Sequence, residues 1–181
     1  MSGFRLDTNV ISAFAKPELN EPAISWLKAA TPETLFVSVI TLGEMRLGIE
    51  NLPTGKRRNE LEQWLETGLP GWFETNLLPV TKAIGERWGR LAIEAKRKGM
   101  TLGTPDGLIA ATAFDHGLTV VTRNEKDFEG LGVPILNPWD ERGELRSSGM
   151  RWFLVHFSMR SDRLWWANVF GQSCPGFCSA P

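Results

Sequence analysis

Several kinds of residue are scarce in this sequence, and each scarcity narrows the possible functions. The 181 residues include two cysteines, Cys174 and Cys178, and two histidines, His116 and His156. Two cysteines close to one end build no disulfide framework, which favours a reducing compartment, and they lack the second ligand pair of a structural zinc site. Ser-His or Cys-His catalysis would have to use a histidine at a helix end or in the C-terminal segment, so the sequence argues against it.

Excess charge of one sign is also missing. With 20 Lys and Arg against 21 Asp and Glu, the formal net charge is -1, so a polyanionic partner must meet a local basic patch. There is no apolar run long enough to span a bilayer and no leader of the signal-peptide type, and we therefore expect a cytoplasmic protein with no membrane partner. Neither a Walker loop nor a Gly-x-Gly-x-x-Gly motif occurs, so no nucleotide cofactor is expected.

What the sequence does contain is a regular alternation of strand and helix patterns. Hydrophobic residues make up 42% of the chain, enough for the core of one domain. Short β-branched and aromatic runs predict strands over 4–6, 35–39, 77–80, 118–122 and 133–136. Helical spacing predicts helices over 10–15, from Pro22, and over 40–49, 56–67, 81–98 and 104–116. Alternation of this kind predicts an α/β fold with a parallel sheet and right-handed crossovers.

Acidic residues follow these strands at recurring positions. Asp7 ends the first strand, Glu44 lies in the helix after the second, Asp106 lies in a first helical turn, and Asn124 and Asp127 follow the fourth strand. A parallel sheet brings such positions to one edge. Two carboxylates about 5 Å apart repel by roughly 3 kcal/mol at an effective dielectric constant near 20, and a divalent cation removes that cost. Because the ligands are oxygens alone, they suit Mg²⁺ or Mn²⁺ better than zinc.

Each acid also has a purely structural interpretation. Asp7 has the residue type and position of a helix cap. The pair Thr41 and Glu44 has the Thr-x-x-Glu spacing of a capping box. With Thr104 as the N-cap, Asp106 falls in the first turn of a helix, where the helix dipole favours negative charge by roughly 0.3 to 1 kcal/mol. The pattern alone leaves both interpretations open.

Five segments carry further information in their order along the chain. They are Leu6-Asp7-Thr8-Asn9-Val10-Ile11, Ser38 to Glu44 with Arg46-Leu47-Gly48, Asp106 to Ala113, Thr122-Arg123-Asn124 with Asp127-Phe128, and Asn137-Pro138-Trp139. Taken together, these segments resemble the PIN-domain ribonucleases, and among them the VapC toxins of bacterial toxin-antitoxin pairs, in particular the FitB-like branch. The resemblance extends in order from residue 4 to about 140. It implies a PIN domain over 1–140, a Rossmann-like α/β/α fold with three layers and a mostly parallel sheet, followed by an extension over 141–181.

The resemblance also implies an activity and partners. It implies a Mg²⁺-dependent endoribonuclease, with Mn²⁺ as a possible substitute, that acts on RNA such as tRNA or rRNA. It further implies a homodimer, a VapB-like antitoxin that inhibits the toxin, and a higher toxin-antitoxin assembly. A PIN fold that has lost activity and serves as a binding protein is the main alternative. Receiver domains and haloacid-dehalogenase-like phosphatases fit less well, because Asn137-Pro138 stands where the first needs a lysine, and Asn9 where the second needs an acid.

Roles are carried over residue by residue. The metal and catalytic acids implied are Asp7, Glu44, Asp106 and Asp127, with Asn124 as a further metal or metal-water ligand. Residues that would orient these acids or contact RNA are Thr8, Asn9, Thr104, Arg46 and Arg123.

The segment from Gly143 to Pro181 departs from the resemblance. It predicts an added strand over 151–157 and a short helical stretch over 164–170. Three interpretations compete for it, namely an extra packing element, an interaction arm, or a segment with little selected function.

Overall fold

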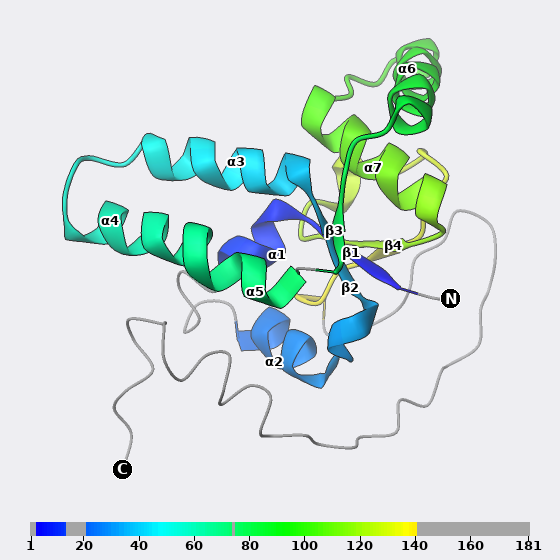
Figure 1. Ribbon diagram of the computed structural model, residues 1–181. Coiled ribbons are helices and arrows are strands. Elements are labelled where there is room, and N and C mark those ends of the chain that lie inside the picture. The colour runs from blue at the N-terminus through cyan, green and yellow to red at the C-terminus, as the bar shows by residue number, and fades with distance from the viewer. Residues whose placement is uncertain (1–2, 14–20, 74, 141–181) are drawn as a thin grey trace.

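Five parallel strands form the centre of the molecule. The computed structural model describes residues 3–13, 21–73 and 75–140 (Figure 1), so the predictions for 14–20 and for the extension over 141–181 lie outside the described residues. The strands are β1 (Phe4–Leu6), β2 (Leu35–Ser38), β3 (Leu77–Leu78), β4 (Thr119–Val121) and β5 (Ile135–Leu136). Their order is β3-β2-β1-β4-β5, with every neighbouring pair parallel. The predicted parallel sheet is thereby confirmed, and the first strand of the chain is its central strand.

Helices connect these strands at close to the predicted positions. They are α1 (Thr8–Ser12), α2 (Glu21–Ala29), α3 (Val39–Glu50), α4 (Lys56–Gln63), α5 (Leu69–Phe73), α6 (Lys82–Arg97) and α7 (Thr104–His116). Short 3-10 turns occupy Pro32–Thr34 and Glu125–Asp127. The helix predicted over 56–67 does not end there, because it continues through a π-helical turn at Trp64–Gly68 into α5.

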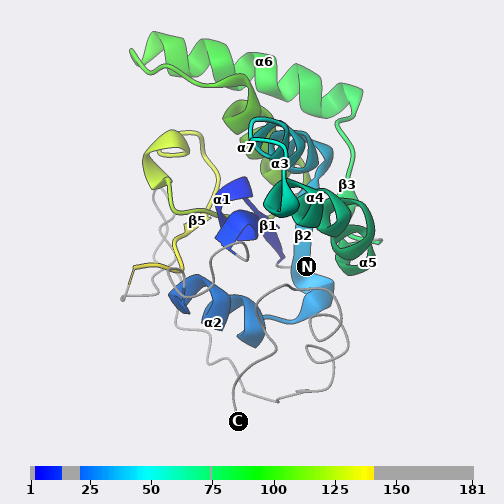
Figure 2. The same cartoon turned by 90° about the vertical axis from the view of Figure 1, so that its left-hand side faces the viewer.

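The sheet lies between two helical layers, which confirms the predicted three-layer architecture. On one face, Leu6, Val37 and Val121 pack with apolar residues of α1, α2, α3 and α5. On the other face, Phe36 and Val120 pack with α6 and α7. Figure 2 shows α6 and α7 on one side of the strands and α2 on the opposite side. Of the helices in the described ranges, none has the length and apolar character needed to cross a membrane.

Helix α7 packs closely against α6 because its buried face consists of small residues. A Cβ atom on Gly107 would lie 2.6 Å from Cδ1 of Trp88, so any larger side chain would displace the indole. The helix ends at Gly117, whose φ of 62° is left-handed and therefore favours glycine. This packing places the N-terminal turn of α7, which carries Asp106, beside the carboxyl end of the sheet.

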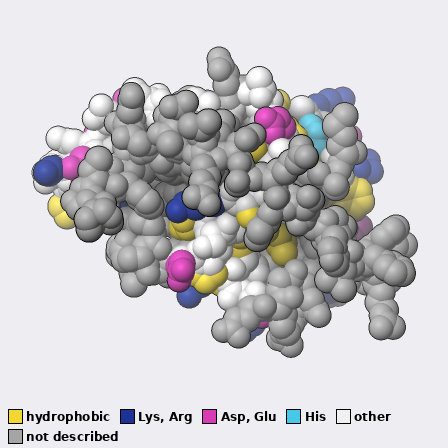
Figure 3. Space-filling view, turned by 90° about the horizontal axis from the view of Figure 1, so that it is seen from below, with side chains coloured by type: hydrophobic (Ala, Val, Ile, Leu, Met, Phe, Trp, Pro, Cys, Tyr) yellow, Lys and Arg dark blue, Asp and Glu magenta, His cyan; other side chains and the backbone are white. Residues whose placement is uncertain are grey.

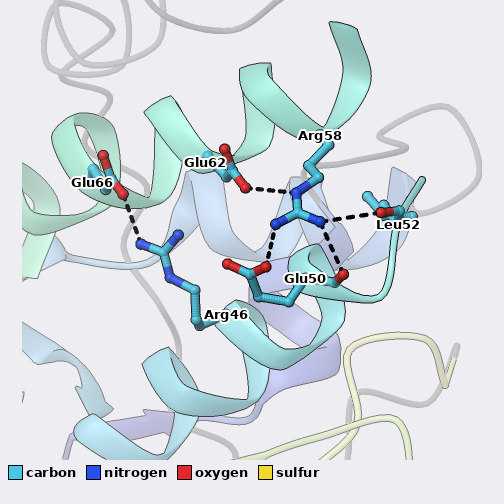
Figure 4. Close-up of polar contacts among 6 residues, drawn as sticks. All are labelled: Arg46, Glu50, Leu52, Arg58, Glu62 and Glu66. Carbon is cyan, nitrogen blue, oxygen red and sulfur yellow. Dashed lines mark hydrogen bonds and ion pairs between the residues drawn. The ribbon is translucent and has the colours of Figure 1, made fainter. Parts of the chain in front are cut away.

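Helices α3 and α4 form a hairpin that polar contacts hold together (Figure 4). The guanidinium of Arg58 on α4 lies between Glu50 of α3 and Glu62 of its own helix, and Nε donates to the latter at 2.8 Å. Arg46 of α3 pairs with Glu66 across a distance of 2.9 Å. These pairs hold α3, which carries Glu44, against the α4 and π-helical segment.

Candidate active site

Asp7 lies at the carboxyl end of β1 with its carboxylate almost fully buried, at 6% exposure. One oxygen accepts the backbone N–H of Thr8 at 2.7 Å, so Asp7 does cap α1. The other oxygen accepts from Asn9 Nδ2 and from Thr122 Oγ1, both at 2.7 Å. Capping therefore accounts for one of three donors, and the remaining two hold the carboxylate at the sheet edge in a fixed orientation.

Thr122 is the centre of this small network, and sequence reasoning did not single it out. Its buried hydroxyl donates to Asp7 and accepts from Asn9 Nδ2 at 3.0 Å and from the Asn124 backbone N–H at 2.9 Å. Thr122 joins the end of β1 to the loop after β4, because its partners come from both. Its position directly after a buried strand, in line with Asp7, was the available signal.

The capping-box interpretation of Thr41 and Glu44 is wrong. Helix α3 begins at Val39, its N-cap is Ser38, and that cap makes no side-chain hydrogen bond. Thr41 Oγ1 instead accepts from Arg5 Nη2 at 2.9 Å, and Glu44 Oε2 accepts the hydroxyl of Thr8 at 2.5 Å. Partners from β1 and α1 have displaced the local cap, and Glu44 is directed toward the end of β1.

Asp106 lies in the first turn of α7, as expected, but Thr104 is not the N-cap. The cap is Gly103, and Thr104 is the first helical residue, one position later than predicted. The carboxylate of Asp106 packs against Gly103, because a Cβ atom at position 103 would lie 2.8 Å from Asp106 Oδ2. The predicted hydrogen bonds from Thr8 and Asn9 to acids are present, whereas none from Thr104 occurs within the described residues.

The electrostatics of Asp106 show that the acids share one environment. The pKa of Asp106 is raised to about 6, first by burial and then by the negative charges of Asp127, Asp7 and Glu44, in that order. The positive charge of Arg5 opposes these effects. Acids from three other segments therefore lie close enough to act on Asp106, as the sheet topology predicts.

The loop after β4 carries the fourth acid. Asp127 ends the 3-10 turn Glu125–Asp127 with its side chain exposed, and it is the largest charge effect on Asp106. Asn124 enters the network through its backbone N–H only, and its side chain is exposed. This difference favours Asp127 over Asn124 as the residue that faces Asp106.

The turn that follows β5 braces this loop. Asn137 Nδ2 donates to Glu125 Oε1 at 2.8 Å, and its Oδ1 accepts the backbone N–H of Trp139 at 3.0 Å. The guanidinium of Arg123 lies 5.7 Å from the centre of the Trp139 ring, within range of a cation-π contact. The Asn137-Pro138-Trp139 segment thus fixes the position of the acid-bearing loop.

The two arginines predicted to contact RNA are close in sequence to acids of the site, Arg46 to Glu44 and Arg123 to Asp127. Arg46 pairs with Glu66, and both side chains are well exposed, at 39% and 62%. Arg123 is exposed, and its backbone N–H donates to Asn9 Oδ1 at 3.2 Å. An exposed ion pair such as Arg46 with Glu66 contributes at most about 1 kcal/mol, so a phosphate can compete for that guanidinium.

The donor chemistry of the site fits a hard divalent cation. Only oxygen ligands are present, and the pKa of Asp106 is raised by burial first and then by the negative charges of its acidic neighbours. Within the described ranges, no three His, Cys, Asp or Glu side chains lie together in an arrangement that could hold a metal ion by themselves. Mg²⁺ would therefore be held by one or two of these carboxylates together with its own waters and substrate phosphates.

Comparison with known proteins assigns this α/β/α fold, with acids near the carboxyl edge of its sheet, to the class of PIN-domain proteins. The profile of the PIN domain matches residues 5–133. VapC ribonuclease Y4jK of Sinorhizobium fredii is 39% identical over 135 residues, 75% of this chain and 96% of that protein. Toxin FitB of Neisseria gonorrhoeae is 38% identical over 136 residues, 75% of this chain and 98% of that protein.

Solved structures agree with these relatives. The crystal structure of FitAcB from Neisseria gonorrhoeae has a TM-score of 0.71 and 38% identity, covering 75% of this chain and 98% of that one. The structure of FitAB bound to an IR36 DNA fragment also has a TM-score of 0.71, with 36% identity and coverage of 76% and 96%. The chain belongs to the PIN-domain family, and within it to the VapC and FitB toxins, as its motifs indicated.

Proposed function

We propose that the chain is a divalent-metal-dependent endoribonuclease, the toxin of a toxin-antitoxin pair, and that its acid cluster is the catalytic site. The observation that carries the proposal is the meeting of Asp7, Glu44, Asp106 and Asp127 in one electrostatic environment. Capping explains part of the role of Asp7 and none of the contacts of Glu44. A shared ion accounts for all four acids at once.

In this proposal Asp7, Glu44, Asp106 and Asp127 hold Mg²⁺ or Mn²⁺, with Asn124 near enough in sequence to contribute a ligand. When bound, the ion supplies charge that orients a water and stabilises the oxygens of a phosphodiester undergoing hydrolysis. Thr8 orients Glu44 through its hydroxyl, and Asn9 and Thr122 orient Asp7. These donors set the geometry before any ion or substrate arrives.

RNA binding is assigned to cations around the site. Arg46 and Arg123 are the candidates, since Arg46 lies two residues after Glu44 in sequence and Arg123 lies in the loop of Asp127. On the face seen from below, Figure 3 shows separate basic and acidic side chains between the grey atoms. With only these two arginines proposed as phosphate contacts, we expect a shallow dependence of affinity on salt.

Partners follow from the relatives. The FitAB and FitAcB structures pair the FitB toxin with a second component, and one holds DNA. We infer that this chain also binds a second component, a VapB-like antitoxin, in a higher assembly, and that it forms a homodimer, as its resemblance to the VapC toxins implies. A cytoplasmic location is part of the same proposal, because tRNA and rRNA are its expected substrates.

The proposal is tested by incubating the purified chain with a pool of tRNA and rRNA, in Mg²⁺ or Mn²⁺ and in EDTA. We expect cuts at few positions that need the ion and are absent with the Asp106→Asn variant. A folded wild-type chain that cleaves nothing under either ion would support the alternative, an inactive PIN fold that serves as a binding protein. Capture of an antitoxin by an inactive chain would then identify its role.

The raised pKa of Asp106 predicts how metal binding depends on pH. A carboxylate must lose its proton to bind a divalent ion, and Asp106 holds its proton up to about pH 6. We expect the affinity for Mn²⁺ to be constant above about pH 7 and to fall below about pH 6, where Asp106 becomes protonated. Isothermal titration calorimetry between pH 5 and pH 8 measures this, and a flat profile would mean that Asp106 does not bind the ion.

A further inference from the structure

A charged residue stands where the fold calls for an apolar one. Arg5 is the middle residue of β1, the central strand, and its register partners are Phe36 on β2 and Val120 on β4. Those partners belong to the apolar core beneath α6 and α7. Central strands of parallel sheets are buried on both faces and are normally apolar throughout. The side chain of Arg5 nevertheless has 0% exposure, so the fold carries a full positive charge in its core.

The contacts of the guanidinium are all with neutral groups. Nη2 donates to Ser38 Oγ at 2.6 Å and to Thr41 Oγ1 at 2.9 Å, and Nη1 donates to the backbone oxygen of Leu6 at 2.9 Å. Nε has no hydrogen-bond partner within the described residues. No ion pair between Arg5 and a carboxylate occurs among them either. A buried charge held in this way is costly unless opposite charges lie nearby.

The nearby opposite charges are the acids of the site. Burial lowers the pKa of Arg5 and the charges of Asp7, Glu44 and Asp106 raise it, which leaves a pKa of about 10, so the guanidinium stays protonated at neutral pH. Two of the three residues that accept hydrogen bonds from Arg5 are also close in sequence to acids of the site. Leu6 precedes Asp7, and Thr41 lies one turn before Glu44 on α3. Arg5 therefore lies beneath the strand end and the helix that present two of the acids.

We propose that Arg5 is an internal counter-charge of the acid cluster, a positioning residue that holds the carboxylates together without metal and weakens the binding of the divalent ion. The inference rests on the proposed function, because it assigns Arg5 a role toward the same ion. Without Arg5, the cluster would repel itself more strongly in the metal-free state and attract a cation more strongly. A site tuned in this way binds its ion loosely until a substrate phosphate adds further ligands.

The test uses the full chain and compares three variants by Mn²⁺ titration at pH 7.5 and by thermal unfolding in EDTA and in saturating Mn²⁺. Arg5→Met, which removes the charge, should bind Mn²⁺ about tenfold more tightly, and its lower melting temperature in EDTA should largely recover in Mn²⁺. Arg5→Lys, which keeps the charge, should bind within about threefold of wild type. Thr41→Val keeps Arg5 but removes an acceptor, and it should lose the same stability with and without the ion.

Two outcomes would overturn the proposal. One is a folded Arg5→Met chain with unchanged Mn²⁺ affinity, and the other is an equal loss of melting temperature in EDTA and in Mn²⁺, since either would mean a purely structural role. If Arg5→Met does not fold, the double variant Arg5→Met/Asp106→Asn decides, because removing one negative charge should restore the metal-free fold. Failure of the double variant to fold would also contradict the proposal.

Failure of the proposed function gives a different pattern. Wild-type protein that binds no Mn²⁺ at millimolar concentration would contradict the metal site itself. The role of Arg5 is then read from stability in EDTA alone, where Asp106→Asn should offset the loss caused by Arg5→Met. If Asp106→Asn does not offset the loss of stability caused by Arg5→Met in EDTA, Arg5 is not a counter-charge of the acids, and this conclusion does not depend on whether the protein cleaves RNA.

Discussion

Asp106→Asn should abolish RNA cleavage while making the metal-free protein more stable at neutral pH. The amide keeps the shape of the carboxylate but loses the charge that attracts the ion, and a loss of several kcal/mol in the transition state corresponds to about 100-fold or more in rate. Stability should move the other way, because the carboxylate accepts no hydrogen bond from the described residues and its ionised form is disfavoured by burial and by three neighbouring acids.

The sign of the stability change follows from the pKa of Asp106. In the unfolded chain an aspartate titrates near pH 3.9, and in the folded chain Asp106 titrates near 6. Between these values the native state holds a proton that the unfolded state has lost, so the contribution of Asp106 to stability falls as pH rises through this window. The Asp106→Asn variant has no carboxyl group to titrate at this position. Its free energy of unfolding relative to wild type should therefore increase from pH 4 to pH 6 and stay constant above pH 6.

Urea unfolding in EDTA at pH 4.5 and pH 7.5 measures this advantage. After allowance for solvent screening we expect up to about 1 kcal/mol in favour of Asp106→Asn at the higher pH, and little difference at the lower one. In saturating Mg²⁺ the order should reverse, because only the wild type gains stability from the ion. A variant that is less stable than wild type at pH 7.5 in EDTA would show that Asp106 serves the helix N-terminus instead.

Asp7→Asn should also abolish cleavage, but at a cost in stability. Both carboxylate oxygens of Asp7 accept hydrogen bonds, one from the Thr8 backbone and the other from Asn9 and Thr122. An asparagine has one acceptor oxygen and an NH₂ group, so a donor must face a donor on one side. Because the site is nearly buried, we expect a loss of about 1 to 3 kcal/mol in the free energy of unfolding.

The two asparagine variants form a matched pair for this measurement. Both remove one negative charge from the same cluster, so a difference in their unfolding free energies in EDTA reports the hydrogen bonds of Asp7. Near-native circular dichroism in both would show that the loss of cleavage is chemical rather than a loss of fold. Equal stability of the two variants would contradict the hydrogen-bond argument for Asp7.

Much of the fold could be predicted because its signals are local or periodic. Gly117 ends α7 directly after the predicted last residue, His116, and Thr81, which was predicted as the first helical residue, is the N-cap of α6, since caps and left-handed glycines depend on neighbours in the chain. The strand order followed no local signal. The placement of four acids at one edge was nevertheless predictable, because every crossover in a parallel sheet returns the chain to the same side.

The errors occur where partners distant in sequence outcompete local ones. Thr41 and Glu44 have capping-box spacing, yet Arg5 and Thr8 bind them across 36 residues of sequence. The helix predicted to end at 67 continues, because Trp64 and Leu65 are buried against the core and hold the next turn in place. The role of Arg5 was not predicted. Its apolar neighbours in a short strand predict that it is buried, but the local sequence does not show which distant groups neutralise its charge.

The central position of β1 has a consequence for the time at which this protein can first act. The hydrogen bond from Thr122 to Asp7 joins residues 115 apart, and β1 pairs with β4 as well as with β2. Because chains are synthesised from the N-terminus at about 5 to 20 residues per second, Asp7 and Glu44 leave the ribosome well before the strand that completes their site. A nascent chain that has extended only as far as α6 carries half of the acids and no assembled centre. If the site is a nuclease, its RNA-cleaving activity therefore begins only near the end of synthesis of the domain.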